Sequence, residues 1–290
     1  MFGIDRDYLQ YRAFFESLSA EYDGRFEVGF VALTLLVKEM GFSFWALLFS
    51  SALISLTAKL YLITRLSNST FWFFVYLLSL YPLHELTQVR VSIALGFGYL
   101  ALYFSFNKRN GFKAIIFATF SVLFHWTLLV FVPFILFVNV LRRRSLFVIG
   151  VVIFAPIIVI FSSLSALSYL NPQVGHMLAT AGEMNANPFS SRNLIFLMLV
   201  FLGLININKL PVSAIPFLYL SIFGISFWYG MMSIPVFAHR IFELTIFSCF
   251  FWISELPKYS KIVAMALFAF LSVYLFINAL YFDPLFGPNR

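Results

Sequence analysis

The sequence predicts an all-α fold, a polytopic bundle of transmembrane helices. Of the 290 residues, 62% are hydrophobic and 11% are charged, whereas soluble domains carry about 25% charged residues. The mean hydropathy is +0.94. The apolar residues gather into runs separated by short polar stretches, and these runs predict about ten spans, some of them short or broken.

The apolar runs define the expected helices in chain order. They lie at residues 42–63, 70–82, 89–106, 112–124, 126–139, 146–162, 193–207, 211–229, 241–255 and 262–282. A straight span needs about 20 apolar residues, so the shorter runs require polar ends that dip into a water-filled cavity. Residues 112–139 could instead form one broken helix, and residues 28–40 are expected to form an interfacial helix. No repeat or linker divides the chain, which predicts one integral membrane domain over residues 1–290.

The positions of lysine and arginine predict the orientation of the bundle. Alternate loops are rich in basic residues and should face the cytoplasm: Arg65; Lys108, Arg109 and Lys113; Arg142, Arg143 and Arg144; Lys209; Lys258 and Lys261. The opposite loops hold only Arg90, Arg192 and Arg240 as bases. The net charge of +7 therefore reflects membrane orientation rather than nucleic-acid binding.

Two polar segments fall on the external side in this topology. Residues 1–27 are charged and contain no apolar run, so we expect neither a signal peptide nor a first span there. A charged amino-terminal segment normally reaches the outside only behind a span, which suggests a helix upstream of it. Residues 163–192 form a long loop, a length that is uncommon unless the loop is functional or disordered.

The stretch from His84 to Ala94 concentrates polar groups between two apolar runs. Such groups are costly in hydrocarbon and indicate a functional site. His84-Glu85-x-x-Gln88 is not a zinc-protease motif, because an amide cannot replace the second histidine on zinc. Arg90 could clamp a phosphate or pyrophosphate, or it could form a buried ion pair with Glu85 or another outer carboxylate.

Two further histidines stand beside apolar runs. His239 and Glu243 are four residues apart and share a helical face, and Arg240 lies close by. The carboxylate of Glu243 could therefore orient either the Arg240 guanidinium or the His239 imidazole. That group could equally serve only to pack the bundle. His125, between two apolar runs, is either a satisfied core histidine or a catalytic base.

Aromatic and acidic residues at the predicted outer level could bind sugars. Trp126 could stack on a sugar ring or belong to an interfacial aromatic belt. The segment with Asp5, Asp7, Tyr8 and Tyr11 could bind an acceptor sugar or supply a base, or it could be a solvated, partly ordered tail.

Several kinds of site are missing from the sequence. It has no Walker A loop, no Asp-x-Asp apart from Asp5-Arg6-Asp7, and a single cysteine, Cys249. The span centres hold mostly Phe, Leu, Ile and Ser, with no conspicuous charge for a proton relay. Arginines without a nucleotide site suggest an already activated donor, such as a lipid pyrophosphate, and no cofactor or metal is expected.

Taken together, these stretches resemble the EpsG family of Wzy-type polysaccharide polymerases. The resemblance begins with Gly3-Ile4-Asp5-Arg6-Asp7-Tyr8, in which the tyrosine stands one place closer than in the family pattern. It continues through Phe14-Phe15-Glu16, Gln88-x-Arg90-x-x-x-Ala94, Phe124-His125 and Arg240. It implies a glycosyltransferase that joins undecaprenyl-pyrophosphate-linked oligosaccharides on the outer face of the bacterial cytoplasmic membrane. A chain-length regulator and a flippase would be its partners, and nucleic acid would not.

The resemblance also implies roles for individual residues. The expected catalytic residues are Arg90, Arg240, His125, His239, Glu243 and Asp5, with the arginines as pyrophosphate clamps and His125 as the leading base. The expected substrate-binding residues are His84, Glu85, Gln88, Asp7, Tyr8, Tyr11, Arg192, His176 and Trp126. A flippase of lipid-linked sugars, a lipid-donor glycan ligase and a membrane acyltransferase remain alternatives from the residues alone.

Overall fold

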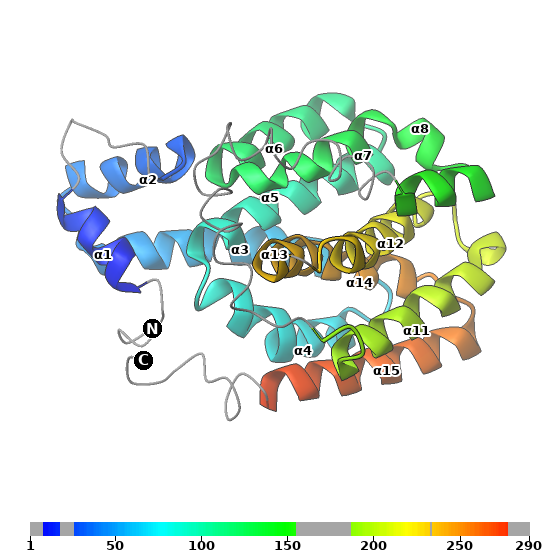
Figure 1. The fold of residues 1–290 in the computed structure, drawn as a ribbon. Helices are drawn as coiled ribbons and strands as arrows, with labels where there is room; N and C mark the ends of the chain where they lie inside the picture. Colours follow the sequence, from blue (N-terminus) through cyan, green and yellow to red (C-terminus); the bar gives the residue numbers. More distant parts are fainter. Residues whose placement is uncertain (1–7, 18–25, 155–186, 233, 278–290) are drawn as a thin grey trace. The chain divides into compact units, whose positions relative to one another are not determined.

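The computed structural model describes residues 8–17, 26–154, 187–232 and 234–277 (Figure 1). These ranges contain helices and connecting turns and no strand, which confirms the all-α prediction. Contacts group the chain into two compact units, residues 1–136 with 269–290, and residues 137–268. The prediction of a single membrane domain is not tested by this grouping.

The first unit is built around α5 (Val89–Phe106). Helices α3 (Phe44–Ile63) and α6 (Gly111–Phe124) pack along it, and α6 lies beside α5 in Figure 1. Gly98 of α5 permits a close approach, because an added Cβ would lie 3.0 Å from both Ser121 Oγ and a ring carbon of Phe131. The remaining helices of the unit are α1 (Tyr8–Ser17), α2 (Val28–Glu39), α4 (Ser69–Leu80), the π-helical turn η1 (Tyr81–Glu85), the 3-10 helix η2 (Trp126–Phe131) and α7 (Val132–Leu136).

The amino-terminal segment is partly ordered, because residues 8–17 form helix α1. Tyr8, Tyr11 and Phe14 recur every three residues and form the buried face of α1. Tyr8 packs edge-on against Phe44, with ring centroids 5.4 Å apart. Phe14 lies 4.0 Å from Phe26 between ring centroids. These aromatic contacts order a segment whose charge alone predicted exposure.

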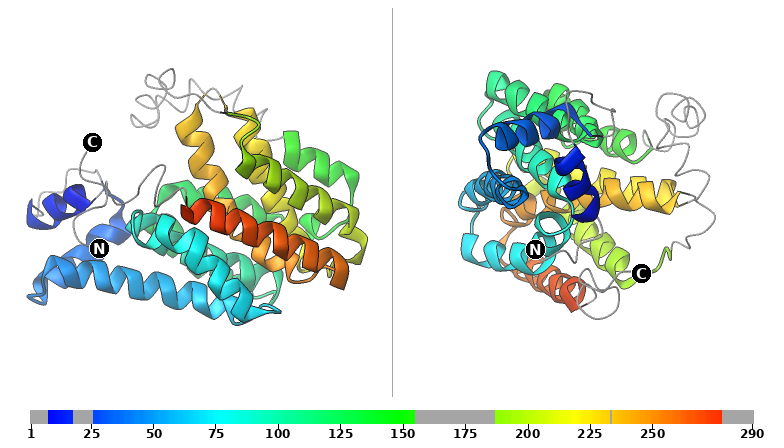
Figure 2. Two further views of the ribbon diagram at one scale, coloured as in Figure 1. Left: turned by 90° about the horizontal axis from the view of Figure 1, so that it is seen from below. Right: turned by 90° about the vertical axis from the view of Figure 1, so that its left-hand side faces the viewer.

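The predicted helix over residues 28–40 is present as α2 (Val28–Glu39), and its interfacial position stays a prediction. It packs against α6, as the right-hand view of Figure 2 also shows. The run 112–139 is broken at His125, where φ is −161° and ψ is 115°. After this extended residue the chain continues as η2, which contacts both α5 and α6. Two separate segments therefore meet at His125.

The second unit centres on α12 (Ile215–Gly230), which packs against α11 (Ser191–Ile205), α13 (Pro235–Ile246) and α14 (Ser248–Ile253). Phe217 and Phe251 stack with centroids 4.1 Å apart. The run 241–255 is thus two helices, and the first begins earlier than predicted because Pro235 suits a helix start. The unit also holds α8 (Val138–Leu141), helical residues 146–154, the 3-10 helix η4 (Ile207–Lys209) and α15 (Lys258–Ile277), whose last residues belong to the first unit.

Within the described ranges, three helices are long and apolar enough to cross a membrane, namely Phe44–Ile63, Val89–Phe106 and Lys258–Ile277. Four shorter apolar segments accompany them: Gly111–Phe124, Trp126–Leu136, Ser191–Ile205 and Ile215–Gly230. The chain is therefore a membrane protein by helix length and composition, but the predicted number of about ten spans is not confirmed. Parts of the predicted runs 146–162 and 262–282 lie outside the described residues.

Candidate functional site

Glu27 joins a guanidinium to an imidazole in the first unit. Its Oε2 accepts a hydrogen bond from Arg90 Nη1 at 2.5 Å, and its Oε1 lies 2.6 Å from His125 Nδ1. The three side chains are largely buried, with exposed fractions of 14% for Glu27, 22% for Arg90 and 10% for His125. We call these three residues the Glu27 cluster.

Three local structures bring the Glu27 cluster together. Glu27 is the N-cap of α2, and its carbonyl accepts the amide hydrogen bonds of Phe30 and Val31. Arg90 lies in the first turn of α5, and His125 is the extended residue that ends α6. All three residues therefore lie at helix ends.

Aromatic rings fix the guanidinium of Arg90. Its central carbon lies 4.6 Å from the ring centroid of Phe26 and 5.7 Å from that of Tyr11. Tyr11 Oη also accepts a long hydrogen bond of 3.5 Å from Arg90 Nε. Cation–π contacts of this kind orient a guanidinium without consuming its remaining N–H donors.

The surroundings of Glu27 keep its carboxylate ionised. Burial raises the pKa of Glu27, but the hydrogen bond from His125 and the positive charge of Arg90 outweigh burial and hold the pKa below its ordinary value. A carboxylate can only accept, so His125 donates to Glu27 through Nδ1–H, and in the neutral imidazole Nε2 is then an acceptor. The arrangement suits His125 to act as a general base oriented by Glu27.

The pH dependence of stability should report this carboxylate. Since the folded pKa of Glu27 is lowered, its ionised form stabilises the protein above the ordinary pKa, and the contribution is lost as the pH falls through the folded value. We expect Glu27→Gln to lower the thermal unfolding temperature in detergent at pH 7, and the difference from wild type to shrink below about pH 4. Glu39→Gln, at the exposed end of α2, is the matched control. If the unfolding temperatures of wild type and Glu27→Gln differ as much at pH 3 as at pH 7, this role is contradicted.

The predicted polar stretch 84–94 divides between two environments. His84 and Glu85 are buried, with exposed fractions of 2% and 3%, whereas Gln88 is half-buried at the start of α5. Glu85 does not pair with Arg90; its carboxylate pairs with Lys59 at 2.5 Å. The substrate-binding roles of His84, Glu85 and Gln88 stay predictions.

A second group of ionisable side chains lies in the second unit. Arg192 of α11 donates to His239 Nδ1 of α13 at 2.5 Å, and its Nη1 lies 3.8 Å from Glu243 Oε1. Because arginine can only donate, His239 accepts at Nδ1 and carries its proton on Nε2. Arg240 is exposed. Thus Arg192, rather than Arg240, makes the close contacts with His239 and Glu243.

Comparison with known families decides the class of this protein. The model of the EpsG family matches residues 1–287, nearly the whole chain. The chain belongs to the EpsG family. This membership identifies a polysaccharide polymerase-like membrane protein, at a coarse level a glycosyltransferase of polysaccharide biosynthesis. The curated proteins and the solved structures that were compared give no match.

Several predicted site residues of this EpsG-family chain fall elsewhere. Asp5, Asp7 and His176 lie outside the described residues. Tyr8 is buried beside Phe44 and Trp45. Trp126 is half-buried directly after His125. The ranges that are described hold no group of three His, Cys, Asp or Glu side chains that could bind a metal ion.

The sequence reasoning missed two residues of this EpsG-family protein. Glu27 directly precedes the apolar run 28–40, which marks it as a charged residue at a helix start. Lys59 is a lone cation inside the run 42–63, and the expectation of spans without conspicuous charge overlooked it. An ionisable residue in such a run is a signal of function or of a buried partner.

Proposed function

We propose that this EpsG-family protein polymerises undecaprenyl-pyrophosphate-linked oligosaccharide repeat units on the outer face of the cytoplasmic membrane. The Glu27 cluster carries the proposal, because one carboxylate holds a base and a guanidinium in one buried site. Glycosyl transfer from a lipid pyrophosphate needs these two functions. Membership of the family supplies the reaction class.

His125 would act on the acceptor sugar. A hydroxyl of the incoming unit attacks the anomeric carbon of the growing chain, and the hydroxyl proton passes to His125 Nε2 as the new glycosidic bond forms. Glu27 stabilises the resulting imidazolium through the 2.6 Å contact with Nδ1. A positioned general base of this kind contributes about 10²- to 10⁴-fold to the rate.

Arg90 would act on the leaving group. As the bond from the anomeric carbon to the pyrophosphate oxygen breaks, the electron pair stays on the lipid pyrophosphate. A guanidinium held by Phe26, Tyr11 and Glu27 can donate its remaining N–H groups to that charge. The donor is already activated, so these steps need no nucleotide.

Arg240 is proposed, from the family resemblance, to bind a phosphate group of the substrate. Its side chain is exposed on α13, one residue after His239. Arg192 and Glu243 would hold His239 as a neutral hydrogen-bond donor through Nε2 for a sugar hydroxyl. These assignments leave His125 as the base.

The test is polysaccharide banding in a deletion strain that carries wild type, Arg90→Ala or Arg240→Ala. We expect a full ladder with wild type and a single repeat unit with either variant, at equal amounts of protein in the membrane. A ladder that is unchanged in the deletion strain itself would overturn the proposal. In a purified system, transfer of one block would indicate a ligase, and lipid reorientation without new bonds would indicate a flippase.

A further inference from the structure

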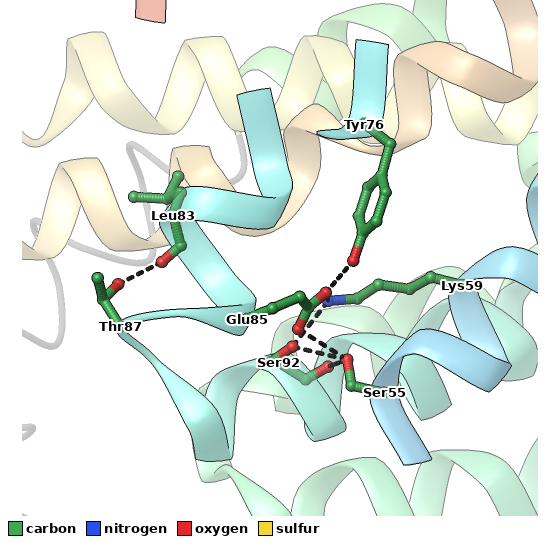
Figure 3. A network of polar contacts seen from close by, with 7 residues as sticks. All are labelled: Ser55, Lys59, Tyr76, Leu83, Glu85, Thr87 and Ser92. Atoms are coloured by element: carbon green, nitrogen blue, oxygen red, sulfur yellow. Dashed lines mark hydrogen bonds and ion pairs between the residues drawn. The ribbon is translucent and has the colours of Figure 1, made fainter. Parts of the chain in front are cut away.

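A second buried polar network lies in the first unit, where Lys59, Tyr76 and Ser55 point toward the carboxylate of Glu85 (Figure 3). Glu85 Oε1 accepts from Lys59 Nζ at 2.5 Å and from the hydroxyl of Tyr76, and Oε2 accepts from Ser55 Oγ at 3.0 Å. Ser92 joins it, because its Oγ lies 3.0 Å from Lys59 Nζ and 2.6 Å from Ser55 Oγ.

The network ties four consecutive elements to one carboxylate. Ser55 and Lys59 come from α3, Tyr76 from α4, Glu85 from the π-helical turn η1 and Ser92 from the first turn of α5. The turn between η1 and α5 is further closed by Thr87 Oγ1, which donates to the carbonyl of Leu83 at 2.5 Å. π-Helical turns inside helical segments are frequent at functional sites.

Arg90 lies inside the segment that this network holds. It stands five residues after Glu85 and two before Ser92. Two residues correspond to about 200° around an α-helix, so Ser92 faces α3 while Arg90 faces Glu27 on the opposite side. The first turn of α5 is therefore fixed on one face by Ser92 and on the other by Arg90.

Stability alone does not explain a charged pair at this depth. The side chains of Lys59 and Glu85 are only 3% and 1% exposed. Replacing a buried ion pair by apolar residues of similar volume is often neutral or stabilising, whereas in some proteins buried polar groups fix the register of packed helices. Here each carboxylate oxygen of Glu85 accepts a hydrogen bond from a side chain of α3, Ser55 or Lys59. Such contacts between elements are what a positioning function requires.

We propose that the Lys59–Glu85 network positions Arg90 for catalysis by fixing the turn that precedes α5. Glu85 and Lys59 are then positioning residues rather than ligands of the substrate. This inference rests on the proposed polymerase function, in which Arg90 binds the lipid pyrophosphate.

The test compares Glu85→Gln with Lys59→Met/Glu85→Gln, each alone and combined with Arg90→Lys. The double variant removes both charges, so no buried charge is left unpaired if the single variant folds poorly. For folded protein we expect a fall in kcat/KM on the order of 10- to 100-fold, the cost of misplacing a catalytic group. We expect little additional loss in the Arg90→Lys background, because coupled residues are not additive. Ser248→Ala, which breaks the buried contact with Ser221 in the second unit, is the control.

Hydrogen exchange of residues 86–92 provides a readout that does not depend on activity. Faster exchange there, with the remainder of α5 unchanged, supports the positioning role. Wild-type activity in the folded double variant overturns it. It is also overturned if the network variants reduce kcat/KM by the same factor in the Arg90→Lys background as in the wild-type background. Failure of every variant to fold would assign the network to stability alone. If wild type itself makes no polymer, the proposed function fails, while the exchange rates still report whether the network holds the turn.

Discussion

Replacing Arg90 with lysine is expected to reduce polymer synthesis by about 100-fold, the loss typical of removing a preorganised donor to a developing charge. Lysine keeps the positive charge and can still meet Glu27. It cannot reproduce the planar fork that donates two parallel hydrogen bonds to a pyrophosphate, nor stack in the same way between Phe26 and Tyr11. The measurement is the rate of chain extension on a lipid-linked acceptor, with membrane protein quantified alongside.

Arg109→Lys is the matched control, because Arg109 is exposed in the turn between α5 and α6. It should leave the ladder unchanged. Full-length polymer made at the wild-type rate by Arg90→Lys would remove Arg90 from the pyrophosphate site. A loss of protein from the membrane would instead show that the contact between Arg90 and Glu27 is needed to fold the first unit.

Replacing His125 with glutamine is expected to lower kcat by about 10²- to 10⁴-fold, the usual contribution of a general base. Glutamine can still hydrogen-bond to Glu27, so the site should keep its shape and KM should change little. It cannot take up a proton near neutral pH, so the acceptor hydroxyl would attack without assistance. Initial rates measured over a range of donor concentrations separate kcat from KM.

Ser121→Ala controls for packing near this histidine. Ser121 lies one turn earlier in α6 and donates to the carbonyl of Ala94 in α5 at 2.7 Å. Removing that bond disturbs the interface between the two helices without touching the Glu27 cluster, and activity should stay close to wild type. If His125→Gln retains wild-type kcat, the base must be sought elsewhere, and His125 becomes a buried structural histidine.

The local sequence pattern predicted much of the helical framework. The apolar runs 42–63, 89–106 and 112–124 lie within two residues of α3, α5 and α6. Hydrophobic runs mark helices in a membrane protein because the backbone must satisfy its own hydrogen bonds there. The pattern was less informative at residues 8–17, where burial of Tyr8, Tyr11 and Phe14 orders a helix within a charged segment.

The composition of the candidate site could be predicted only in part. Arg90 and His125 were identifiable as polar groups beside apolar runs, yet their shared partner Glu27 was not. It lies 63 residues from Arg90 and 98 residues from His125. Periodicity reports which face of one helix is buried, but it carries no information on which distant helix end meets that face.

The sequence by itself determined the membrane class, the positions of α3, α5 and α6 and, through its motifs, the family. Only the tertiary structure decided which charges pair: Glu27 with Arg90 and His125, Lys59 with Glu85, and Arg192 with His239 and Glu243. The physical reason is that burying a charge is costly unless a partner offsets it. The chain therefore had to bring partners together from distant segments, and helix packing selected those partners.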